Sequence, residues 1–89
     1  MKISLTFLEG TWICARYGLK KIDLDFTGHT LGDLLGLLPE NLGSDVEKDL
    51  KDPVLQLILN GRIFKSPFDL QQLLHQEDHL VFLKALDGG

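Results

Sequence analysis

The chain has 89 residues, a hydrophobic fraction of 44% and a charged fraction of 25%, values typical of a single soluble globular domain. Its net charge is −4 and its basic residues form no patch, so neither nucleic acid nor a membrane is expected as the main partner. No apolar run is long enough to span a membrane, and the N-terminus has no secretory signal. The single cysteine, Cys14, excludes an internal disulfide and favours a cytoplasmic protein.

Two segments near the N-terminus, residues 1–9 and 20–26, alternate apolar and polar side chains. This alternation predicts two half-buried strands paired as a β-hairpin. The intervening residues 10–18 are long for a hairpin loop and partly apolar, which is compatible with strands that extend into them. Cys14 lies there beside Trp12, and a lone cysteine in apolar surroundings is typical of a packed hydrophobe rather than a reactive thiol.

A helix is predicted from Thr30 to Leu38, because leucines recur at a spacing of three and four residues. Thr30 is suited to the N-cap position, and Asp33 in the first turn complements the helix dipole. Pro39 is expected to end this helix.

A second, short helix is predicted within residues 41–52, where Ser44 and Glu47 have the spacing of a capping box. We expect it to be mostly exposed. Its acidic residues are typical of a solvated helix face, although they could also steer the protein towards a basic groove on a partner.

Three more strands are predicted in the second half of the chain, at residues 54–59, 62–64 and 79–86. Asn60-Gly61 between the first two is a strong hairpin signal. A helical or irregular connector and a polar turn precede the last strand.

The order of these elements predicts an α+β fold of the β-grasp type, with a mixed sheet of four to five strands wrapped on one main helix. The first and last strands are expected to be parallel neighbours at its centre, since the last strand is almost continuously apolar. We assign residues 1–87 to this domain and residues 88–89 to a flexible Gly-Gly tail.

The Leu-rich helix, the strand and turn at residues 57–61, the polar turn at residues 76–78 and the terminal Gly88-Gly89 together resemble the MoaD/ThiS family of ubiquitin-like sulfur-carrier proteins. The resemblance covers the whole chain, and the length is closer to MoaD. It implies the same fold and a chemistry confined to the C-terminus.

In such a carrier the carboxylate of Gly89 would be adenylated with ATP by a ubiquitin-activating-type partner, MoeB-like or ThiF-like. The product would be converted to a thiocarboxylate and would donate its sulfur to a MoaE-like or ThiG-like synthase. Gly88 and Asp87 would thread the partner's active site. The resemblance therefore implies a carrier rather than an enzyme, with no bound cofactor. Where MoaD-like tails carry prolines, this chain has Lys84-Ala85-Leu86-Asp87, which leaves the tail less stiffened.

A docking surface is expected on the solvent face of the sheet, and its candidates are Leu8, Phe82, Leu83 and Leu86. The three histidines, His29, His75 and His79, match no common metal-ligand spacing, so no metal site is predicted.

Two other functions have the same sequence support. The chain is also compatible with a ubiquitin-like modifier joined to lysines through Gly89, or with a non-covalent β-grasp interaction module. The receiving pathway, the activating enzyme and the oligomeric state stay open.

Overall fold

The structure, a computed structural model, describes residues 1–8, 10–18 and 20–84. Five strands and three helices are found in these ranges. In chain order they are β1 (Lys2–Phe7), α1 (Trp12–Tyr17), β2 (Lys20–Asp25), α2 (Leu31–Leu42), α3 (Ser44–Lys51), β3 (Leu55–Leu59), β4 (Arg62–Lys65) and β5 (His79–Lys84). Every predicted strand is present, although residues 9, 85 and 86 of the predicted ranges lie outside the described residues, and α1 is an unpredicted helix.

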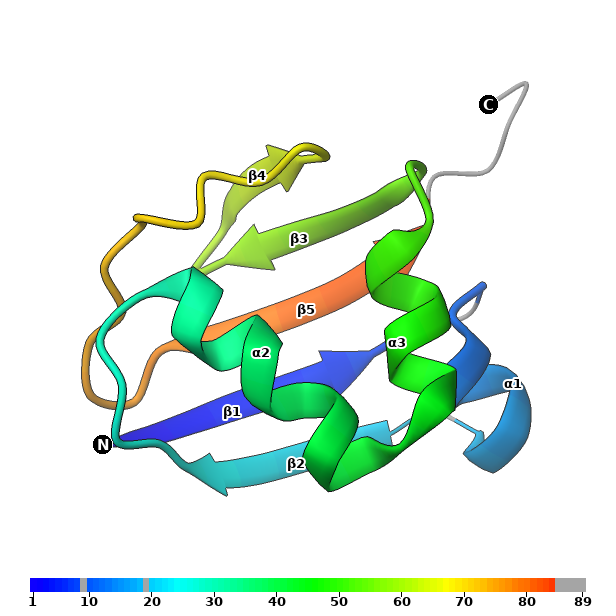
Figure 1. Ribbon diagram of the computed structural model, residues 1–89, viewed down its shortest axis with the longest axis horizontal. Coiled ribbons are helices and arrows are strands. Elements are labelled where there is room, and N and C mark those ends of the chain that lie inside the picture. The colour runs from blue at the N-terminus through cyan, green and yellow to red at the C-terminus, as the bar shows by residue number, and fades with distance from the viewer. Residues whose placement is uncertain (9, 19, 85–89) are drawn as a thin grey trace.

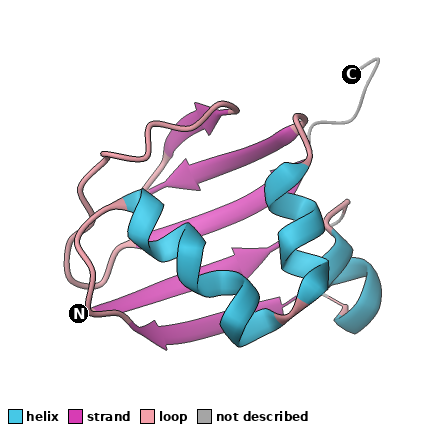
Figure 2. Cartoon of the chain, viewed as in Figure 1, coloured by secondary structure: helices cyan, strands magenta, loops and turns pink. Residues whose placement is uncertain are grey.

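The strands form one mixed sheet in the order β2-β1-β5-β3-β4. β1 and β5 are parallel neighbours at its centre, as predicted, and the other pairs are antiparallel. α2 and α3 cover one face of the sheet (Figure 1), and no helix of the described residues lies on its other face (Figure 2). Strand alternation therefore divides the side chains into a core set under the helices and an outer set.

The core lies between the sheet and the helices. β1 contributes Ile3, Leu5 and Phe7, and β5 contributes Leu80 and Phe82, all with no exposed surface. The helices complete it with Ile13, Leu31, Leu34, Leu38 and Val46. Cys14 is also buried, as expected of a small packed side chain.

The Asn60-Gly61 turn joins β3 to β4 as predicted. Asn60 and Gly61 have φ values of 48° and 90°, the left-handed pair that a type I′ hairpin turn needs. The Asn60 side chain also donates to Asp78 Oδ1 at 2.8 Å and accepts from the His79 N–H at 3.0 Å. The turn is thereby tied to the start of β5.

α2 begins where the sequence predicts and ends later. Thr30 and Asp33 form a complete capping box, in which the Thr30 hydroxyl accepts from the Asp33 N–H and the Asp33 carboxylate accepts from the Thr30 N–H. Hydrogen bonds from the His29 and Thr30 backbone lower the pKa of Asp33. The predicted end at Pro39 is wrong, because α2 continues to Leu42, which packs against the core.

α3 departs from its prediction in two respects. Ser44 is its first residue rather than its N-cap, and Gly43 stands at the cap with no side-chain hydrogen bond. The helix was also expected to be mostly exposed, yet Val46 and Asp49 have no exposed surface. Burial of the Asp49 carboxylate is compensated by its bonds to α1 and β5, and helical periodicity alone does not predict these partners.

Candidate functional site

β5 is the element that leads to the predicted reactive end of the chain. It occupies the centre of the sheet, and Lys84 is its last residue. Leu86, Asp87, Gly88 and Gly89, which were predicted to contact or enter a partner, lie outside the described residues. The described structure that comes closest to them in sequence is the end of β5 and its surroundings.

Phe82 is wrong as a docking residue. Its side chain has no exposed surface and stacks on Phe7, with ring centroids 4.5 Å apart and an interplanar angle of 20°. Successive side chains of a strand point to opposite faces, so Phe82 and Leu83 cannot both face outward. The structure places Phe82 in the core and leaves Leu83 half-buried on the outer face.

The outer face carries an apolar stripe that runs from the middle of β5 towards its end. Ile58 is paired in register with Ile63 on β4 and with Val81 on β5. Leu83 follows two residues along β5, and Leu8 lies next to it, where the Leu8 N–H donates to the Phe82 carbonyl at 2.9 Å. We call these five residues the apolar stripe. Ile63 is 62% exposed and the other four are half-buried.

Two of the predicted docking residues, Leu8 and Leu83, therefore belong to one continuous surface. Ile58 and Ile63 were missed. The alternation of residues 55–59 and 62–65 could have found them, because Ile58 lies between core leucines and faces Ile63 across the hairpin.

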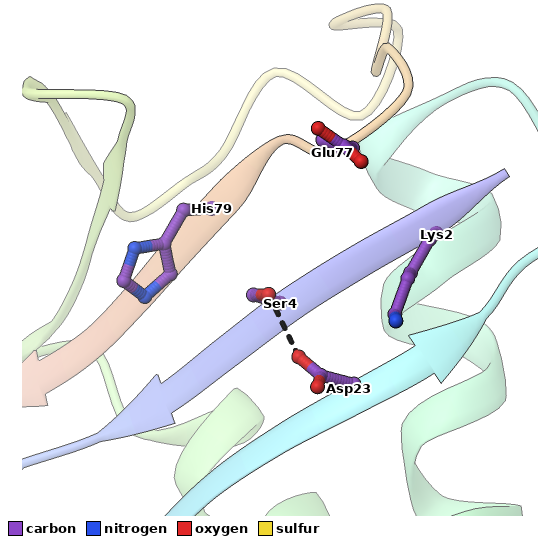
Figure 3. A pocket seen from close by; sticks show the side chains of 5 residues that line it. All are labelled: Lys2, Ser4, Asp23, Glu77 and His79. Atoms are coloured by element: carbon purple, nitrogen blue, oxygen red, sulfur yellow. Dashed lines mark hydrogen bonds between the residues drawn. The ribbon is translucent and has the colours of Figure 1, made fainter.

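The other half of the outer face is polar and forms an open depression of about 390 Å³ lined by Lys2, Ser4, Asp23, Glu77 and His79 (Figure 3). Ser4 donates to Asp23 Oδ1 at 2.9 Å, and the His79 ring bonds to the Thr6 hydroxyl at 2.9 Å. The serine is thus bonded to the carboxylate rather than to the imidazole, an arrangement unlike that of a nucleophile activated by a histidine base.

No metal centre is formed in residues 1–8, 10–18 and 20–84, where no group of three His, Cys, Asp or Glu side chains could hold an ion. In the same part of the chain no helix is both long and apolar enough to cross a membrane.

On the helix side of the sheet, the end of β5 is held by a largely buried ion-pair cluster of Lys84, Asp49 and Asp52. The Lys84 ammonium lies 2.9 Å from Asp49 Oδ1 and 3.0 Å from Asp52 Oδ2. Burial by itself lowers the pKa of Lys84, but the hydrogen bonds to Asp49 and Asp52 outweigh it and raise the pKa above its ordinary value of 10.5. The pKa of Asp52 is lowered, first by the Val54 N–H and then by Lys84.

Asp49 also forms the N-terminal cap of α1. Its carboxylate accepts from the Trp12 N–H at 2.7 Å and from the Ile13 N–H at 3.3 Å. The Thr11 hydroxyl accepts from the Cys14 N–H at 3.1 Å, so three amides of the short helix are satisfied by side chains. This explains why residues 12–17 form a helix instead of extending the flanking strands.

No protein-family model and no curated protein sequence matches this chain. The crystal structure of SAMP1 from Haloferax volcanii is similar with a TM-score of 0.75 and 17% identity, covering 100% of both chains. The solution structure of the Haloferax volcanii HVO 2177 protein is similar with a TM-score of 0.69 and 19% identity, covering 100% of this chain and 87% of that one. The fold is a ubiquitin-like β-grasp.

Within this β-grasp, the two features around the end of β5 lie on opposite sides of the sheet. Leu83 belongs to the apolar stripe on the outer face, and Lys84 belongs to the ion-pair cluster on the helix face. The buried cluster was missed, because the acidic residues 45–52 were interpreted as solvated. Asp49 lies three residues after Val46 and directly before Leu50, so the apolar spacing of α3 could have indicated that it faces inward.

Proposed function

We propose that the protein is a sulfur carrier of the MoaD-like kind, activated at the carboxylate of Gly89 and lacking catalytic chemistry of its own. The observation that carries the proposal is a ubiquitin-like β-grasp whose central strand, β5, leads within five residues to Gly88-Gly89. The proposal requires Gly89 to be the C-terminal residue of the mature protein.

The chemistry belongs to the terminal carboxylate and to partner enzymes. A MoeB-like or ThiF-like adenylyltransferase joins the Gly89 carboxylate to AMP and releases pyrophosphate from ATP. Hydrosulfide then attacks the acyl carbon, AMP leaves with the bonding electrons, and the product is a thiocarboxylate. A MoaE-like or ThiG-like synthase takes the sulfur in cytoplasmic cofactor synthesis, with molybdopterin as the first candidate. The carrier supplies a docking surface and holds no cofactor.

The apolar stripe is the proposed docking surface. It combines Leu8 and Leu83 with Ile58, Ile63 and Val81 on neighbouring strands, on the sheet face opposite α2 and α3. Ile63 is 62% exposed and the other four residues are half-buried, so the stripe offers partly accessible apolar surface of the kind that is typical of protein–protein contact sites. Its place near the end of β5 brings a docked partner close to the residues that precede Gly89.

Intact-mass spectrometry tests the proposal. The protein is incubated with ATP, sulfide and each ubiquitin-activating-type enzyme encoded in the same genome. We expect a mass increase equal to the exchange of one oxygen for one sulfur. Alkylation of the thiocarboxylate should add the mass of the alkyl group, and hydrolysis should return the original mass. A variant that lacks Gly89 is the matched control and should show no increase. Absence of the exchange with every such enzyme would refute the sulfur-carrier function.

A ubiquitin-like modifier is the second candidate. The likeness to SAMP1 supports a sulfur-carrier fold and a modifier fold equally, and both functions use an activated terminal glycine. Immunoblotting of the tagged protein in a lysate separates them. Thiol-resistant, high-mass adducts that disappear when Gly88 and Gly89 are deleted would establish conjugation. Full function of that deletion variant would instead indicate a non-covalent interaction module.

A further inference from the structure

The ion-pair cluster lies where the described part of the last strand ends. The Lys84 side chain is only 10% exposed and the Asp49 side chain is fully buried, while Asp52 is 30% exposed. Five residues, 85–89, follow Lys84 in the sequence. A charged residue so close to a functional terminus would ordinarily be solvated, because burying an ammonium group is costly unless it is paired.

The cluster connects three elements to one another. Asp49 on α3 bonds to the Lys84 ammonium and to the Trp12 and Ile13 amides of α1. The Lys84 ammonium also lies 5.7 Å from the centre of the Trp12 ring, within the range of a cation–π contact. Figure 1 shows α1, α3 and the end of β5 at the same edge of the molecule. The last residue of β5 is therefore held by α1 and α3 as well as by its strand neighbours.

The length of the remaining chain makes this attachment consequential. Five residues reach at most about 17 Å when fully extended. A displacement of the end of β5 shifts the origin of that reach, and a misplacement of a reacting group by about 1 Å can cost about 10²-fold in rate. Residues 84–87 contain no proline, so no pyrrolidine ring fixes a φ angle in this segment.

We propose that Lys84 is a positioning residue for activation of Gly89, because its ion pairs with Asp49 and Asp52 fix the end of β5, to which residues 85–89 are joined in sequence. This inference rests on the proposed function. Prolines in a tail would restrict its direction, and here the ion pairs of Lys84 would restrict its starting point instead. Docking on the apolar stripe is a separate task.

Steady-state activation kinetics test this role. Lys84→Met removes the ammonium group, Lys84→Arg retains a charge that can bond to both carboxylates, and Lys51→Met is the matched control because Lys51 pairs with Glu47 in solvent. With the activating enzyme and ATP, we expect Lys84→Met to lower kcat about tenfold or more with KM unchanged. Lys84→Arg should recover most of kcat, and Lys51→Met should match the wild type.

Asp52→Asn provides a second variant in case Lys84→Met does not fold, since it weakens only the partly exposed half of the cluster and leaves the Lys84–Asp49 pair in place. It should lower kcat less than Lys84→Met and in the same direction. An unchanged kcat in both variants would overturn the inference. A raised KM with unchanged kcat would also overturn it, because Lys84 would then act in docking.

A measurement without any partner makes the result independent of the proposed function. The heteronuclear NOE of the Leu83 and Lys84 amides reports fast motion at the end of β5. It should fall in Lys84→Met, recover in Lys84→Arg and stay unchanged in Lys51→Met. If the wild type is never activated, the sulfur-carrier function fails, and this NOE still decides whether Lys84 fixes the end of the strand. An unchanged NOE in Lys84→Met would overturn the inference.

Discussion

Asp49→Asn is the substitution with the largest expected effect for the smallest change in shape. The carboxylate has no exposed surface, and it receives the Lys84 ammonium at 2.9 Å, the Trp12 N–H at 2.7 Å and the Ile13 N–H at 3.3 Å. Asparagine keeps one acceptor oxygen and replaces the other with an NH₂ donor. That donor meets either an ammonium or an amide N–H, so at least one buried group loses its partner.

The expected cost is about 3–5 kcal/mol, the usual range for removing one partner of a buried ion pair. A domain of this length has a total stability of about 5–13 kcal/mol, so the substitution consumes a large part of it. Urea unfolding followed by far-ultraviolet circular dichroism measures this loss without depending on Trp12, which adjoins the cluster. Glu47→Gln on the same helix is the matched control, because its pair with Lys51 is exposed, and its midpoint should stay close to the wild type.

A double-mutant cycle with Lys84→Met isolates the pair from the cap of α1. The double variant should lose less stability than the sum of the two single variants, with a coupling of about 1–3 kcal/mol. The part of the Asp49→Asn loss that survives in the Lys84→Met background measures the bonds to the α1 amides. A loss below about 1 kcal/mol in Asp49→Asn, the usual size for an exposed pair, would refute the claim that this carboxylate is a buried structural group.

Four further outcomes follow from the structure. Phe82→Ala should cost about 3–5 kcal/mol in urea unfolding, whereas Leu83→Ala on the outer face should cost about 0.5 kcal/mol and raise the KM for an activating enzyme. Gly61→Ala should cost about 1–2 kcal/mol, because its φ of 90° strains a residue with a Cβ in otherwise open space. Thr30→Ala should cost about 1 kcal/mol through loss of the N-cap of α2, measured by thermal unfolding. The pKa of Lys84 is raised in the folded state, so the stability that the charged Lys84 contributes is complete below pH 10.5 and is lost as the pH rises through the folded pKa. The difference in unfolding free energy between the wild type and Lys84→Met should therefore narrow above pH 10.5.

Local patterns were sufficient to predict the strands and most of the topology. Alternation identified β1 and β2, a nearly continuous apolar run identified β5, and Asn60-Gly61 identified the β3–β4 hairpin, because these signals depend on residues close in sequence. Helix α1 was not predictable in this way. Two of its N-terminal amides are capped by Asp49, which is 37 and 36 residues away, so its strongest stabilising contacts exist only after the chain has folded.

The candidate site was predictable only in part, for the same reason. The sequence indicated a surface on the outer face but assigned Phe82 and Leu83 to it together, although the two faces of a strand exclude this. Phe7 and Phe82 are buried on the helix side of the sheet, so the residues that alternate with them along β1 and β5 face outward. The pairing of Asp49 with Lys84 joins α3 to β5, and no spacing rule within one element indicates that contact.

Under the proposed function, the alternation of β5 assigns docking and positioning to successive residues. Leu83 faces outward into the apolar stripe, and Lys84 faces the helices and the two carboxylates. Binding energy gained at the stripe acts on substrate and transition state alike, so its loss raises KM. Precise placement of the terminal carboxylate acts on the chemical step, so its loss lowers kcat. Leu83→Ala and Lys84→Met should therefore separate the two kinetic constants although their backbone positions are adjacent, and identical effects on KM and kcat would contradict this division.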